Sequence, residues 1–160
     1  MADDTYESEG TIQEVVGKFE RCEYAAEQFT HARHLTVACW YLCTSPADQA
    51  LVRMREGLTR FIAHHGKQGY HETLTRFWME LLGSYLREFA AGTPITTKVN
   101  RALQCYGSKE VVFSYYTRER VISETAKREW VEPDLRAIEG SSAGLPSEEF
   151  RRMVEQWLAS

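Results

Sequence analysis

Two short stretches of this chain hold most of the residues that could do chemistry. The first runs from Phe29 to Leu35 and reads FTHARHL, and the second runs from Tyr70 to Thr73 and reads YHET. A neutral imidazole can ligate a metal, a protonated one can bind an anion, and either form can exchange protons near neutral pH. The neighbouring hydroxyls and carboxylate add hydrogen-bonding groups. The stretches predict a polar site, but they specify no reaction, so whether the protein is an enzyme stays open.

Helical periodicity places most of the histidines on apolar faces. In the helix expected from Phe29 to Cys43, His31 and His34 share a face with Leu35, whereas Thr36 falls on the opposite face with Arg33 and Trp40. His65 continues the apolar stripe of the helix that starts after Ser45, and His71 begins the apolar stripe of the helix expected over about 70–90. We therefore expect these four histidines to be mostly buried and His64 to be exposed.

The remaining helices follow from apolar spacing and from end signals. Thr11 and Glu14 form a plausible capping box for a helix over 11–23, and Ser45 with Pro46 is typical of a helix start. Gly66 and Gly92 are typical helix ends. The other expected helices cover about 70–90, 93–106, 109–116 and 118–130, the last of them capped by Thr117.

No segment of the sequence reads as a strand with a partner, so the fold class expected is all-α. The pattern predicts a single-domain antiparallel bundle of about six to seven helices over residues 11–138. Residues 1–10 are expected to form a frayed acidic N-terminus, 139–146 a linker, and 147–160 a C-terminal docking helix. That helix would pack through Phe150, Val154 and Trp157.

Short connections between the second, third and fourth helices predict that neighbours run antiparallel. The N-termini of the second and fourth helices then lie at the same end of the bundle as the C-terminus of the third. This topology would gather all five histidines of the chain into one layer. The candidate pocket comprises the residues of these helix ends, namely Thr30, His31, His34, His65, Tyr70, His71, Glu72 and Thr73.

Three interpretations of this layer remain open. It could bind or transform a small polar or anionic molecule, because helix N-termini offer free N–H groups and attract negative charge. It could instead hold a divalent metal such as zinc, iron or manganese through His31, His34 and His71, and so support a metal-dependent enzyme. It could also serve only structure or protein interaction. We favour the first, because the helix dipoles oppose a cation and no specific metal motif is present.

Composition narrows the class of protein. The chain has 160 residues and a net charge of −4, and its basic residues are scattered, so no nucleic-acid partner is expected. No apolar run approaches the length of a membrane span, and no secretory signal is visible. The four cysteines form no C-x-x-C pair and are expected to be reduced in a cytoplasmic protein. A homodimer is left open.

The FTHxxHL and YHET motifs, together with Trp130-Val131-Glu132-Pro133-Asp134, resemble the motifs of a family of small uncharacterised bacterial all-helical proteins. The resemblance covers about residues 11–135 and leaves out the last helix. The family has no established function, so the resemblance implies the location of a site and no chemistry.

Overall fold

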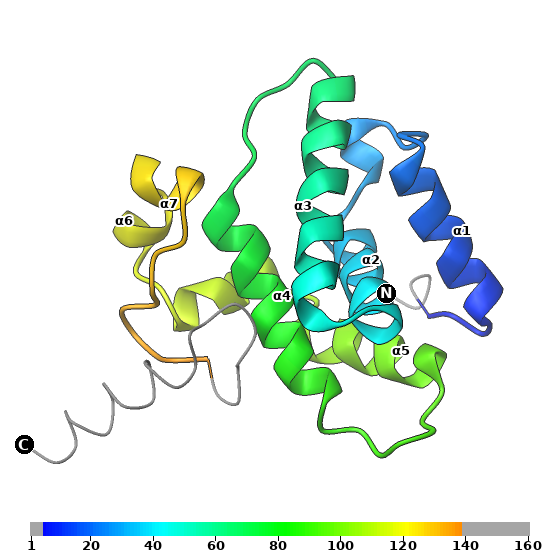
Figure 1. The fold of residues 1–160 in the computed structure, drawn as a ribbon. Helices are drawn as coiled ribbons and strands as arrows, with labels where there is room; N and C mark the ends of the chain where they lie inside the picture. The colour runs from blue at the N-terminus through cyan, green and yellow to red at the C-terminus, as the bar shows by residue number, and fades with distance from the viewer. Residues whose placement is uncertain (1–4, 139–160) are drawn as a thin grey trace, which may run out of the picture.

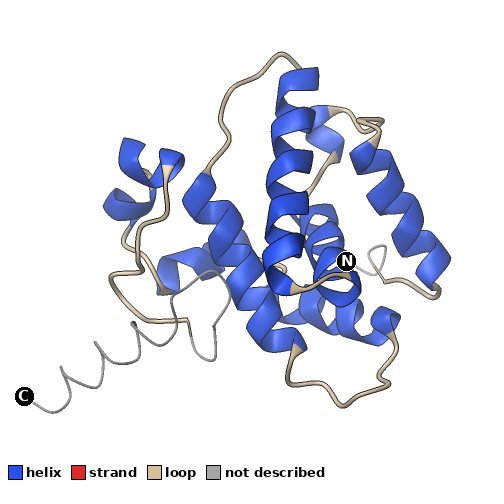
Figure 2. Ribbon diagram, viewed as in Figure 1, coloured by secondary structure: helices blue, strands red, loops and turns tan. Residues whose placement is uncertain are grey.

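The structure is a computed structural model that describes residues 5–138, and this part of the chain is helical with no strand. The all-α bundle predicted from the sequence is therefore confirmed (Figure 2). Its α-helices are α1 Glu9–Glu20, α2 His31–Thr44, α3 Ala47–His64, α4 Glu72–Leu86, α5 Ile95–Tyr106, α6 Arg118–Val121 and α7 Glu124–Arg128, and its 3-10 helices are η2 Ala26–Gln28 and η3 Lys109–Ser114. The linker over 139–146 and the docking helix over 147–160 lie outside the described residues.

Helix α2 is the centre of the bundle and contacts α1, α3, α4 and α5 (Figure 1). Because neighbours surround it, the helix buries nearly its whole middle section, including Leu35, Val37 and Cys39. The prediction that Thr36 lies on an outer face is wrong, since this residue is fully buried. Its hydroxyl donates to the carbonyl of Ala32 at 2.8 Å, which satisfies a polar group inside the core.

Two helix starts differ from their predictions. Ser8, and not Thr11, caps α1, because its Oγ accepts the backbone N–H of Thr11, and the helix begins at Glu9. Pro46 occupies the cap position of α3 without any side-chain hydrogen bond, so Ser45 is not the cap. The predicted stop at Gly66 is confirmed, since α3 ends at His64 and the φ angle of Gly66, 64°, lies in the left-handed region. Gly92 also has a left-handed φ angle of 87°, but the prediction that it ends α4 is wrong, because that helix stops at Leu86.

The segment after α5 is more broken than predicted. Residues 109–114 form the 3-10 helix η3, and the single helix expected over 118–130 is divided into α6 and α7. Thr117 caps α6 as predicted, by accepting the N–H of Arg120, but Ser123 then caps α7 by accepting the N–H of Ala126. Helix α4 also ends early, at Leu86 rather than at Ala90. The result is a short-helix wall, residues 107–128, that packs against α4 through α7.

The described part of the N-terminal segment is attached to the bundle. The backbone N–H of Tyr6 donates to Asn100 Oδ1 at 2.8 Å, and Asn100 Nδ2 donates back to the Tyr6 carbonyl at 2.9 Å. Residues from Tyr6 onward therefore differ from the frayed terminus expected over 1–10. Over the described residues, no helix combines the length and the apolar character that a membrane crossing requires.

Candidate functional site

A pocket of about 580 Å³ lies between the first turns of α2 and α4 and the short-helix wall. This volume is in the range of small-molecule sites. Because His31 and His71 both line it, the N-termini of α2 and α4 lie at the same end of the bundle, as the topology predicted. We call this site the histidine pocket, and its polar lining consists of Thr30, the imidazoles of His31, His34 and His71, the cations of Lys109, Arg118 and Lys127, and the carboxylate of Glu110.

His31 attaches α2 to the last residue of α5, directly before the short-helix wall. Its Nε2 lies 3.0 Å from the carbonyl of Tyr106, an acceptor, so this nitrogen carries the proton and donates. The ring also meets Trp78 edge-on, with 4.9 Å between ring centroids. Burial lowers the pKa of His31 below its usual value, and nearby Lys109 lowers it further, although the bond to Tyr106 acts in the opposite direction. The ring is therefore neutral at neutral pH.

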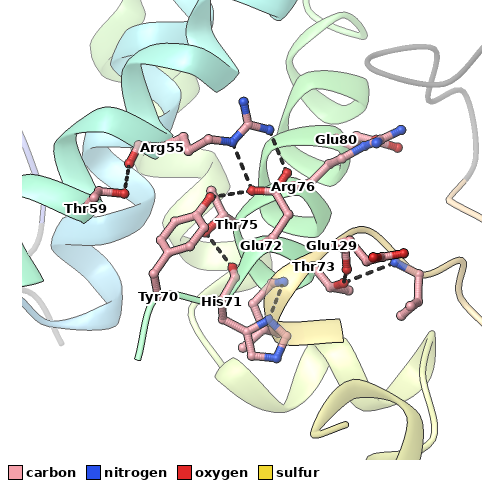
Figure 3. Close-up of polar contacts among 12 residues, drawn as sticks. Arg55, Thr59, Tyr70, His71, Glu72, Thr73, Thr75, Arg76, Glu80 and Glu129 are labelled. Carbon is pink, nitrogen blue, oxygen red and sulfur yellow. Dashed lines mark hydrogen bonds and ion pairs between the residues drawn. The ribbon is translucent and has the colours of Figure 1, made fainter. Parts of the chain in front are cut away.

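His71 attaches α4 to the short-helix wall, and Figure 3 shows its ring at the start of α4. Its Nδ1 accepts the backbone N–H of Leu74 at 3.1 Å, which makes His71 the N-cap of α4, and its Nε2 donates to the carbonyl of Val121 at 2.7 Å. Burial lowers its pKa, and Lys127 adds to that shift. Since both ring nitrogens are already engaged, His71 has no lone pair left for a metal in this arrangement.

His34 is different because its ring makes no hydrogen bond to any described residue. The ring packs beside that of Phe29, with 5.6 Å between the two ring centroids. No fully buried side-chain nitrogen or oxygen of the described residues lacks a partner, so the ring nitrogens of His34 must reach the pocket space. Burial lowers its pKa to about 4, with smaller contributions from His31 and Lys109. His34 therefore offers a neutral donor and acceptor to whatever enters the pocket.

The rim of the pocket is mostly cationic. Lys109, Arg118 and Lys127 are exposed there, against the single carboxylate of Glu110. The guanidinium of Arg118 lies 4.4 Å from the centroid of the Phe113 ring, and Lys127 forms a 3.2 Å ion pair with Glu124. The lining of the pocket therefore carries more positive than negative charge, and Lys109 and Lys127 add to the lowering of the histidine pKa values that burial causes.

Tyr70 and Glu72 lie outside the pocket, contrary to the sequence prediction. Glu72 turns toward α3, where Arg55 donates to both of its carboxylate oxygens, at 2.9 and 2.6 Å, and Tyr70 adds a 2.6 Å hydrogen bond (Figure 3). Burial alone would raise the pKa of Glu72, but the bonds from Arg55 and Tyr70 outweigh it and lower the pKa. We call these three residues the Arg55 cluster.

Thr73 and Thr30 also have structural partners. The buried Thr73 hydroxyl donates to the carbonyl of Glu129 at 2.8 Å and accepts the N–H of Val131 at 3.1 Å, so it fixes the chain that follows α7 and does not reach the pocket. Thr30 does line the pocket, and its hydroxyl caps α2 by accepting the N–H of Arg33.

His64 and His65 are predicted to join the histidine layer, but neither lines the pocket, and His65 has a partner elsewhere. The Nε2 of His65 donates to the carbonyl of Tyr24 at 2.9 Å, and the His65 ring packs on Phe61. His64 is exposed, as predicted. His31, His34, His65 and His71 are half-buried rather than mostly buried, because three of them border the open pocket.

The cationic rim is the part of the site that sequence reasoning missed. Arg118 and Lys127 belong to the basic residues that are scattered along the sequence, a pattern that predicts no nucleic-acid partner and locates no pocket. The short helices of the wall bring them together with Lys109 over the histidines. The signal available in the sequence was the recurrence of basic residues among the apolar ones from Lys109 to Lys127.

Within residues 5–138, no group of three or more His, Cys, Asp or Glu side chains is arranged to hold a metal ion. The proposed ligand set of His31, His34 and His71 fails in this structure for a local reason. His71 uses both of its nitrogens, and the Nε2 of His31 is bonded to Tyr106.

Searches with protein-family models, among curated proteins and among solved structures found no match to this chain. The resemblance to a bacterial all-helical family therefore stays a prediction, and the function has to be argued from the geometry of the pocket.

Proposed function

We propose that this protein binds a small, negatively charged molecule in the histidine pocket. One observation carries the proposal. The neutral imidazole of His34, which has no hydrogen-bonding partner among the described residues, opens into a cavity whose rim holds three cations and one carboxylate. An anion at the rim would meet complementary charge, and a polar group deeper in the pocket would meet a free donor and acceptor.

Binding is better supported than acid–base catalysis or metal chemistry. A general base works best when its pKa lies near the working pH, and the pKa of His34 is about 4. A metal at His71 would require the loss of its N-cap bond or of its bond to Val121. A purely structural role accounts for His31, which joins α2 to α5, and for His71, which joins α4 to the wall, but it leaves His34 unexplained.

The proposal can be tested by titrating the protein with acetate, benzoate and inorganic phosphate while the ring signals of the histidines are followed by NMR. We expect at least one of these anions to shift the His34 signals and to raise the pKa of its ring, because a bound negative charge favours imidazolium. Since binding then takes up a proton, affinity should increase as the pH falls toward about 4, the pKa of the ring without a ligand.

A matched pair of variants locates the binding site. Lys109→Gln removes a rim charge, whereas Lys67→Gln removes an exposed charge in the loop between α3 and α4, outside the pocket. We expect Lys109→Gln to weaken anion binding about fivefold and Lys67→Gln to leave it unchanged, as for a charge loss of about 1 kcal/mol. The proposal is wrong if none of the three anions perturbs His34, or if the two variants behave alike.

A further inference from the structure

The polarity of the histidine pocket changes with depth. Its inner wall consists of side chains with almost no surface exposure, among them Trp78, Val112 and Val121, which are 6%, 5% and 3% exposed. The imidazoles of His31, His34 and His71 are half-buried, and the cations of the rim are exposed. A ligand that fills this space therefore needs an apolar body and a charged end.

The aromatic side chains indicate the shape of that body. Phe29, Trp78 and Phe113 all line the cavity. Aromatic faces and edges pack well against a flat ring system. A volume of about 580 Å³ is also far more than a bare phosphate or acetate ion would fill, and such an ion would leave the apolar wall in contact with water.

Resting on the proposed function, we propose that the ligand is an aromatic organic acid. Its ring system lies against Trp78 and Phe113, and its anionic group lies at the rim among Lys109, Arg118 and Lys127. A polar substituent on the ring would reach His34. Ile122 supports this orientation. It lines the pocket at the rim with 55% of its surface exposed, and the outer part of the ring system would cover it.

Four probes separate the contribution of the ligand's ring system to the binding affinity from that of its negative charge. They are 2-naphthoate, which has both features, 2-naphthalenemethanol, which has the ring system without the charge, and acetate and inorganic phosphate, which have the charge without the rings. Quenching of tryptophan fluorescence is a suitable readout because Trp78 lines the pocket, and calorimetry provides the affinities. We expect 2-naphthoate to bind at least tenfold more tightly than each of the other three.

Two substitutions and a control test the placement of the ring. Phe113→Ala should weaken 2-naphthoate binding at least threefold and leave acetate binding unchanged. Ile122→Ala, at the exposed rim, should weaken 2-naphthoate binding by a smaller factor. This second variant keeps the test valid if Phe113→Ala does not fold. Val52→Ala is the control, because Val52 is an exposed apolar residue of α3 outside the pocket.

The outcomes distinguish this inference from the proposed function. If acetate or phosphate binds in the pocket as tightly as 2-naphthoate, the aromatic ligand is wrong and anion binding stands. If 2-naphthalenemethanol binds as tightly as 2-naphthoate, charge is not recognised and both proposals are wrong. If no probe binds, both are wrong as well. Unchanged 2-naphthoate affinity in both Phe113→Ala and Ile122→Ala contradicts the placement of the ring.

Discussion

The first turn of α4 contributes to two polar regions that are organised in opposite ways. In the Arg55 cluster the carboxylate of Glu72 receives two bonds from the guanidinium and one from the tyrosine, so the three groups are partners of one another. In the histidine pocket, His71 is equally well bonded, but His34 has no hydrogen-bonding partner among the described residues and faces open volume.

This difference separates structural polar groups from groups available to a ligand. Charges that satisfy one another help to fix the position of two helices, and they gain little from any further partner. A desolvated group that lacks a partner keeps its hydrogen-bonding capacity for a ligand. Although the sequence grouped Tyr70, His71 and Glu72 into one site, only His71 belongs to the pocket.

The largest effect is expected where the Arg55 cluster is broken. Glu72→Ala leaves Arg55 and Tyr70 without their shared acceptor and removes an acidic residue from the first turn of α4. We expect the free energy of unfolding to fall by about 3 kcal/mol, and the melting temperature by about 6–12 °C. Glu56→Ala, an exposed residue of α3, is the control. Loss of 2-naphthoate affinity in folded Glu72→Ala protein would show that the two regions are not independent.

The next effect concerns acid stability. The pKa of His34 is about 4 in the folded protein, against an ordinary value of 6.5, so the unfolded chain binds the proton more readily. Stability linked to His34 is therefore present above about pH 6.5 and is lost as the pH falls toward 4. Between pH 6.5 and 4 the free energy of unfolding of the His34→Leu variant should fall by about 2 kcal/mol less than that of the unsubstituted protein. Urea unfolding at several pH values measures this difference. Identical pH profiles would contradict the neutral state of this half-buried ring.

The smallest effect is expected where the cap bond of His71 is lost separately from its bond to Val121. Asparagine can still cap α4 but cannot reach Val121, whereas alanine loses both functions. His71→Asn should therefore be more stable than His71→Ala by about 1 kcal/mol in urea unfolding. The same pair of substitutions at the exposed His64 should show no such difference. Equal stabilities at position 71 would mean that the ring does not act as a cap.

Much of the fold was predictable because it depends on local patterns. Apolar spacing located the long helices, Gly66 with its positive φ marked the end of α3, and short connections placed the starts of α2 and α4 together. Helix ends set by competing caps were less predictable. Ser8 and Thr11 both suit a helix start, and only the packed structure shows which one is used.

The sequence by itself determined that this chain is an all-α bundle and that His31, His34 and His71 meet at one end of it, because helical period and antiparallel connection are local properties. The tertiary structure decided the rest of the site. In the folded chain Glu72 pairs with Arg55, His65 donates a hydrogen bond to the carbonyl of Tyr24, and Lys109, Arg118 and Lys127 lie around the same pocket as the histidines. These outcomes depend on contacts between residues far apart in the chain, which no local spacing encodes.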